Sequence, residues 1–236
     1  MESEGLRLFD TPEENFDDAG RILKQGFCRS DHAWSPLAVT RLPQNIQQKG
    51  DDMIKINFGS GGGEGKLSGW TNVDLDRNCR PDVIADLSKD LPFPTASVDY
   101  IHSEDFIVQL SLSSGYHFLR ECRRILKPNG AMRLLTPDLE KFVRTYLEEP
   151  EWLVRTWETF VGFPLITRSA CEVFNLGMRM AGEFHYDRPT FKRVAAECGF
   201  RVVEVEYSQS DFEALRGLDL RRPHESISMY FECYPR

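Results

Sequence analysis

From residue 53 onward, the apolar positions switch between short strand-like runs and helical stripes. Residues 53–58 form an apolar-rich run that stops at a glycine-rich stretch, which predicts a strand followed by a loop. A helical stripe covers 116–126, and strands flank it, so that a parallel sheet is expected. Further strands are predicted at 71–74, 82–86, 98–103, 131–136, 201–207 and 227–233.

A long helical region follows the fifth predicted strand. It begins at Asp138 and extends to about residue 182, which is longer than a crossover between strands requires. A last helix is opened by Asp187 and Pro189 and closed by Gly199. The sequence therefore predicts an α/β domain over 51–236. We expect a Rossmann-like sheet of seven mostly parallel strands with an antiparallel last strand, helices on both faces, and a helical insertion at 137–182.

The first fifty residues lack this alternation of strands and helices, and we interpret them as an N-terminal extension. Thr11 and Pro12 start a predicted helix, whose apolar face runs to Leu23. The stretch 27–50 has no periodicity, so it is either a linker or a lid that folds over a pocket.

Composition and charge narrow the classes of function. The 236 residues contain 29 Lys and Arg against 37 Asp and Glu, and the net charge of −8 disfavours a nucleic-acid partner. No segment approaches the roughly 18 apolar residues of a membrane span, and the acidic start lacks the features of a signal or transit peptide. We expect a cytoplasmic protein without membrane contact. The six cysteines form no C-x-x-C pair, so no metal site is predicted.

The glycine run after the first strand is the strongest candidate for ligand binding, because glycines let the backbone approach a ligand closely. It does not match a dinucleotide fingerprint, since Glu64 takes the third glycine position, nor a P-loop, since Leu67 follows Lys66. Asp74 ends the next strand, where a carboxylate can accept bonds from ribose hydroxyls, and Asp76 is the competing acid. Only fifteen residues separate Gly59 from Asp74, so the intervening helix must be reduced to about one turn or replaced by the 63–69 loop.

Taken in order, the motifs of residues 56–138 resemble the class I S-adenosylmethionine-dependent methyltransferases, in particular a small branch with a G-W-x-N-V-D-L signature. The motifs are N-F-G-S-G at 57–61, G-W-T-N-V-D-L at 69–75, D-L at 86–87, L-P-F-P at 91–94, S-V-D-Y-I at 97–101 and L-K-P-N-G at 126–130. Y-D at 186–187 and the tail 222–226 extend the likeness to about two thirds of the chain.

The resemblance implies that S-adenosyl-L-methionine is the cofactor and that a methyl group is transferred to an acceptor. The residues implied to bind the cofactor are Gly59, Ser60, Gly61, Asp74, Leu75, Asp86, Leu87 and Ser103. The insertion at 137–182 is expected to form the acceptor pocket. Because nucleic acid is disfavoured, we expect a small-molecule acceptor, and Trp34, Trp152, Trp157, Phe160 and Phe163 suggest an apolar or aromatic one, as in specialised metabolism.

A base is useful when the acceptor is a hydroxyl or an acidic carbon. The candidate catalytic residues are His185, Glu104 and Tyr186, with His102 and Asp187 close to them in the sequence. Each also has a structural interpretation. His185 can be a loop histidine, Tyr186 a packed aromatic side chain, and Asp187 a helix N-cap.

Two alternatives to a methyltransferase remain. The branch usually has an acid–histidine pair where this chain has Val108 and Gln109, which leaves room for a protein that binds S-adenosylmethionine but catalyses another reaction or regulates a partner. The other alternative is a nicotinamide-dependent oxidoreductase, which the broken fingerprint disfavours.

Two groups of basic residues are the last candidates for a functional role. Arg120, Arg123, Arg124, Lys127 and Arg133 are predicted to form a solvated face near a helix C-terminus. Arg221 and Arg222, with His224, either bind an anionic group or pair with Asp219 and Glu225.

Overall fold

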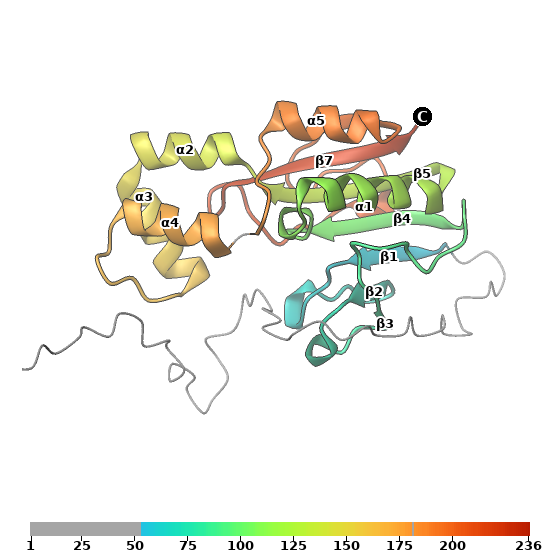
Figure 1. The fold of residues 1–236 in the computed structure, drawn as a ribbon, viewed down its shortest axis with the longest axis horizontal. Coiled ribbons are helices and arrows are strands. Elements are labelled where there is room, and N and C mark those ends of the chain that lie inside the picture. Colours follow the sequence, from blue (N-terminus) through green and yellow to red (C-terminus); the bar gives the residue numbers. More distant parts are fainter. Residues whose placement is uncertain (1–52, 181) are drawn as a thin grey trace, which may run out of the picture.

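The computed structural model describes residues 53–180 and 182–236, and these residues form one seven-stranded sheet (Figure 1). The strand order is β3-β2-β1-β4-β5-β7-β6. β7 runs antiparallel to both of its neighbours, and the other pairs are parallel. The expected Rossmann-like sheet is confirmed. The strands are β1 (Lys55–Phe58), β2 (Thr71–Asp74), β3 (Val83–Ile84), β4 (Val98–Glu104), β5 (Leu126–Pro137), β6 (Phe200–Glu204) and β7 (Ser228–Pro235).

The connections at the β1 side of the sheet are short. A single 3₁₀ turn, η2 (Gly63–Gly65), stands between β1 and β2, and another, η3 (Arg77–Cys79), between β2 and β3. The short spacing from Gly59 to Asp74 therefore has the expected consequence: the first helix of the doubly wound pattern is reduced to one turn.

Two long helices cover one face of the sheet, α1 (Leu112–Ile125) and α5 (Arg188–Glu197) (Figure 1). Their apolar faces belong to the same core cluster as the inward side chains of β1, β4, β5 and β7. Ser111 caps α1 by accepting from the amide of Ser114, and Asp187 caps α5 by accepting from Thr190. The main hydrophobic core lies between these helices and the sheet.

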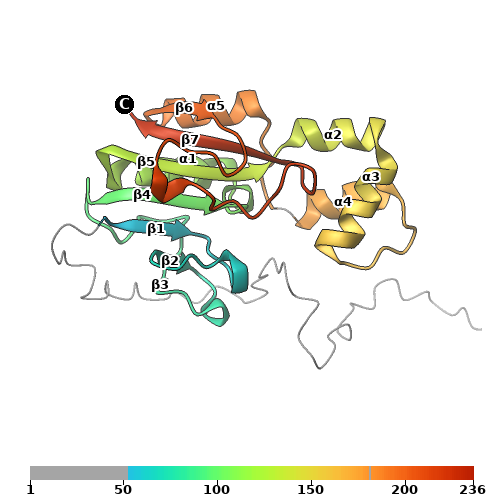
Figure 2. The same ribbon diagram turned by 180° about the vertical axis from the view of Figure 1, so that it is seen from behind.

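Among the described residues, the opposite face carries far less helix than the pattern predicts. The segment that joins β6 to β7 crosses it (Figure 2) and contains the 3₁₀ turn η6 (Glu213–Leu215). Trp70, Ala131 and Leu215 form a small apolar cluster there. Beside this cluster a polar row crosses five strands in register: Asn72, Asn57, His102, Arg133 and Glu232. Residues of this polar face anchor segments at the carboxyl edge of the sheet.

A helical insertion follows β5 and stands beyond the carboxyl end of the sheet (Figure 1). It contains α2 (Leu139–Glu148), α3 (Pro150–Thr156), the π turn η5 (Trp157–Val161) and α4 (Ala170–Met180). Asp138 caps α2 by accepting from the amide of Glu140. The insertion has its own apolar cluster around Phe142, Leu153, Trp157 and Val173.

The predicted N-terminal helix and lid at 1–50, including Trp34, lie outside the described residues. Within the described part, none of the helices has the length and hydropathy needed to cross a membrane.

Candidate functional site

The loop after β1 is tied to the next strand by its backbone. The amides of Gly59 and Ser60 both donate to the carbonyl of Val73, at 2.9 and 3.2 Å. Gly59 has a φ of +64°, and a Cβ atom there would lie 2.5 Å from the side chain of Phe106. A glycine is therefore required at position 59 both by conformation and by space.

Asp74 faces this loop from the end of β2. Its Oδ2 atom accepts from the amide of Gly61 at 2.8 Å, and its Oδ1 atom accepts from Asp76 at 2.9 Å. A carboxylate has about four lone-pair sites, so Asp74 keeps capacity for two further donors. Asp76 instead caps η3 by accepting from the amide of Asn78 at 2.8 Å. Of the two candidate acids, Asp74 is the one whose carboxylate contacts the glycine loop.

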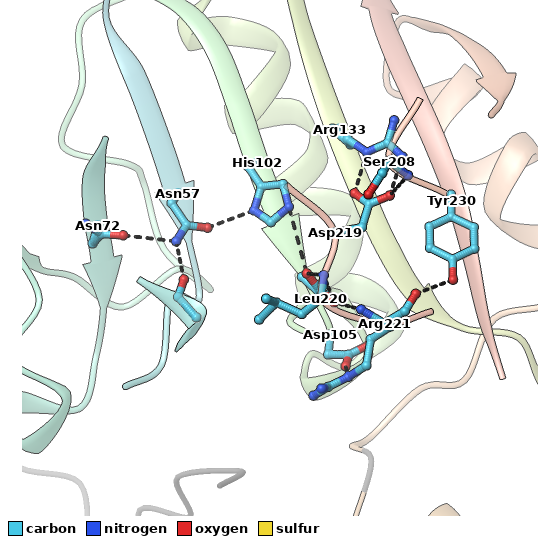
Figure 3. A network of polar contacts seen from close by, with 12 residues as sticks. Asn57, Asn72, His102, Asp105, Arg133, Ser208, Asp219, Leu220, Arg221 and Tyr230 are labelled. Atoms are coloured by element: carbon cyan, nitrogen blue, oxygen red, sulfur yellow. Dashed lines mark hydrogen bonds and ion pairs between the residues drawn. The ribbon is translucent and has the colours of Figure 1, made fainter. Parts of the chain in front are cut away.

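Two buried asparagines hold the far end of the loop, and sequence reasoning missed both. Asn57 donates to the carbonyl of Gly65 at 2.8 Å and to the side chain of Asn72 at 3.0 Å (Figure 3). Asn72 in turn accepts from the amide of Leu67 at 2.8 Å. The signal available in the sequence was two asparagines on otherwise apolar strands, a costly placement unless their amides are satisfied.

The other predicted cofactor residues lie near the same edge with different surroundings. Leu75 is 43% exposed directly after β2, whereas Leu87 is buried in the main core. Asp86 accepts from both the amide and the hydroxyl of Ser88. Ser103 is fully buried on β4, and its hydroxyl has no hydrogen-bond partner among the described residues.

Glu104 ends β4 and holds the segment that precedes β7. Its carboxylate accepts from the amides of Leu220 and Arg221 at 2.9–3.2 Å. Burial, followed by the charge of Asp105, raises the pKa of Glu104 to about 8. The ring of His102 lies 4.0 Å away, and burial lowers the pKa of this histidine to about 4. At neutral pH, Glu104 is therefore mostly protonated and His102 is neutral.

Asp105 follows with a left-handed backbone, φ +54°, and pairs with Arg221 at 2.7 Å (Figure 3). Of the two acids weighed as partners of Arg221, Arg222 and His224, Asp219 pairs with Arg133 instead. Glu225 lies 3.6 Å from Arg222 and 3.2 Å from His224.

Arg133 lies at the centre of a buried ion cluster on the polar face. Its guanidinium pairs with Asp219 and with Glu232, and all three side chains are at most 1% exposed. It also donates to the carbonyls of Glu206 and Gln209, so it anchors the segment that leads to Arg221. The predicted solvated basic face is thus wrong for Arg133, which points into the protein because β5 alternates its side chains between the two faces.

Arg124 also departs from the predicted basic face. It pairs with Glu121 and donates to the carbonyls of Leu91 and Phe93, which fixes the L-P-F-P loop against α1. This side chain is a structural clamp.

A cavity of about 160 Å³ lies where the helical insertion meets the segment before β7. Its walls are mainly apolar, and four aromatic side chains contribute to them: Phe142, Trp152, Trp157 and Phe160. The remaining lining includes Asp105, His185, Arg221, Arg222 and Glu225. Asp105, which directly follows β4, is thus part of the cavity wall. In the sheet, β4 pairs with β1.

The predicted catalytic residues are not all brought together. His185 lines the cavity, and burial lowers its pKa, so the ring is neutral at pH 7. Tyr186 is fully buried among Phe184 and Phe191 in the main core, where burial raises its pKa to about 12. Asp187 is the N-cap of α5. Tyr186 and Asp187 occupy structural positions, whereas His185 faces the cavity.

Comparison with known protein families gives a match over part of the chain. Residues 70–134 match the family model described as a methyltransferase domain. The comparison with curated proteins gives no match.

Several solved structures share the fold at low sequence identity. An S-adenosylmethionine-dependent methyltransferase from Mesorhizobium loti is 15% identical, with a TM-score of 0.48 over 81% of this chain and 94% of that chain. A geranyl diphosphate C-methyltransferase from Streptomyces coelicolor is also 15% identical, with a TM-score of 0.44 over 80% and 73%. A TehB-like methyltransferase from Corynebacterium glutamicum is 16% identical, with a TM-score of 0.43 over 78% and 80%.

The matched segment, residues 70–134, lies within the Rossmann-like sheet. The match supports the class suggested by the sequence motifs, the S-adenosylmethionine-dependent methyltransferases, with S-adenosyl-L-methionine as the cofactor.

Proposed function

We propose that the protein transfers the methyl group of S-adenosylmethionine to a small-molecule acceptor held in the cavity. The observation that carries this proposal is the position of Asp105. It follows the strand that pairs with β1, and β1 ends at the glycine loop, so donor loop and acceptor cavity share one edge of the sheet. Ligands of open α/β sheets bind at this carboxyl edge.

The glycine loop and Asp74 suit the donor. The positive φ at Gly59 and Gly61 brings backbone close to the ligand without side-chain hindrance, and the free lone pairs of Asp74 can accept two ribose hydroxyls. Ser60, Leu75, Asp86, Leu87 and Ser103 complete the proposed donor site. The sulfonium methyl group is already activated, so alignment and water exclusion are the main tasks of the protein.

On the acceptor side, His185 is the proposed base, because it is neutral and lines the cavity. Glu104 is proposed to be a positioning residue. Through Leu220 and Arg221 it fixes the segment that closes the cavity opposite the helical insertion. We assign no catalytic role to Tyr186, since its hydroxyl is enclosed in the core.

Calorimetric titration tests the donor half. Wild type is expected to bind S-adenosylmethionine and S-adenosylhomocysteine, and not NADH. Asp74→Ala is expected to weaken both sulfur ligands by about 30-fold or more, because the ribose loses a charged acceptor. Asp76→Ala is the matched control and should retain binding within about 3-fold. Absence of binding of either sulfur ligand to wild type would overturn the proposal.

A further inference from the structure

The cavity is partly open to solvent, and its interior offers room for a small ligand. A dry apolar cavity of about 150 Å³ accommodates one benzene molecule. The cavity beside Asp105 measures about 160 Å³, and its lining includes Phe142, Trp152, Trp157 and Phe160. Its dimensions and lining suit a single aromatic ring, which packs favourably against aromatic neighbours.

Two polar atoms of the lining lack partners, and both are acceptors. Across 53–180 and 182–236, no group bonds to Asp105 Oδ1 or to His185 Nε2, although both atoms are buried. The other carboxylate oxygen of Asp105 is engaged with Arg221. The other ring nitrogen of His185 donates to the backbone of Gly177, which leaves the lone pair of the neutral ring on Nε2. A buried hydrogen-bond acceptor without a partner costs free energy, so a ligand that donates a hydrogen bond is favoured here.

The charges of the lining argue against an ionic ligand. Arg221 is paired with Asp105, and Arg222 lies 3.6 Å from Glu225. With His185 neutral, the two cations and two anions of the wall cancel. A carboxylate or an ammonium group would therefore have to break an existing pair to gain one of its own.

We propose that the acceptor is an uncharged single-ring phenol, whose hydroxyl donates to His185 Nε2. The inference rests on the proposed function for its chemistry. The phenol oxygen forms a bond to the methyl carbon of S-adenosylmethionine as the carbon–sulfur bond breaks. The electron pair of that bond stays on sulfur, giving S-adenosylhomocysteine, and His185 takes the hydroxyl proton.

Binding of phenol itself tests this without any turnover. Phenol, toluene, benzoate and benzylammonium are titrated while the fluorescence of the tryptophans is recorded. Phenol is expected to bind wild type about 10-fold more tightly than toluene, which has the same shape but no donor, and more tightly than either ion.

Three variants locate the effect. His185→Phe keeps a ring but removes the acceptor, and is expected to bring the affinity for phenol down to about that for toluene. Thr156→Trp fills the cavity and is expected to abolish binding of both. His117→Phe, at a partly exposed histidine of α1 outside the cavity, is the matched control and should change neither.

S-adenosylhomocysteine binding, measured on the same samples, separates the two proposals and reports on folding. Equal binding of phenol and toluene to wild type, tighter binding of benzoate or benzylammonium, or phenol binding that survives Thr156→Trp would overturn the acceptor class alone when S-adenosylhomocysteine still binds. If wild type does not bind S-adenosylhomocysteine, the proposed function itself is overturned.

Discussion

The proposed donor edge and the proposed acceptor cavity are built in opposite ways. The proposed donor edge comes from one continuous stretch, 55–104, in which backbone amides and the carboxylate of Asp74 shape the glycine loop. The acceptor cavity is assembled from Asp105, the helical insertion and the segment 220–228, and apolar side chains form most of its wall. A site made from local backbone is specified by short motifs, whereas a site made from distant side chains depends on how buried anchors place its parts.

The largest expected effect concerns the anchor of the acceptor side. Arg133→Met leaves the carboxylates of Asp219 and Glu232 buried without their cation. Removal of one partner from a buried ionic cluster costs about 3–5 kcal/mol, and we expect a loss of this size in the free energy of unfolding, measured by urea denaturation.

Arg144→Met is the control for this experiment. Arg144 pairs with Glu140 on the surface of α2, with both side chains more than half exposed, and exposed pairs contribute at most about 1 kcal/mol. If the two variants lose the same stability, the buried cluster does not anchor the acceptor side.

Gly59→Ala affects the donor edge alone. The new methyl group would lie 2.5 Å from Phe106 and force a left-handed backbone on alanine, which costs about 1–2 kcal/mol before any overlap is relieved. We expect S-adenosylhomocysteine to bind at least about 10-fold more weakly in calorimetry, and phenol to bind as in wild type. Gly217→Ala, also at a positive φ but with open space around the added atom, serves as the control, and its S-adenosylhomocysteine affinity should equal that of wild type.

A pH-dependent effect lies at the junction of the two regions. The pKa of Glu104 is about 8 in the folded protein against 4.5 ordinarily, so the folded state binds the extra proton between these pH values. The stabilising contribution is complete below pH 4.5 and is lost as the pH rises through about 8. Wild type is therefore expected to lose stability between pH 5 and 9 relative to Glu104→Gln, in thermal unfolding at a series of pH values. Parallel profiles of the two proteins would contradict the assigned protonation.

The sequence predicts the strands and turns around the glycine loop well because the information that specifies them is local. The apolar run before Gly59, the spacing to Asp74 and the alternation of later strands each specify backbone within a few residues, and the structure has strands at or close to the predicted positions. Asp138 and Asp187 likewise predict where α2 and α5 begin, because each caps its helix with its own side chain.

The acceptor side could not be predicted to the same depth. Arg133 and Asp219 are 86 positions apart, and the basic residues around Arg133 suggested a solvated face. Which partner Arg221 selects depends on the backbone turn at Asp105, and a charge pattern contains no information about that turn. Long-range pairing of charges is decided by topology, since any acid could satisfy the same arginine.

One measurement tests the central claim most directly: formation of S-adenosylhomocysteine by wild type at concentrations where calorimetry shows both S-adenosylmethionine and phenol to be bound. The account predicts acceptor-dependent production of S-adenosylhomocysteine together with the methyl ether of phenol, and a large loss of rate in His185→Phe. Occupied donor and acceptor sites with no product above the rate without protein would contradict it, and would leave a protein that binds S-adenosylmethionine for another purpose.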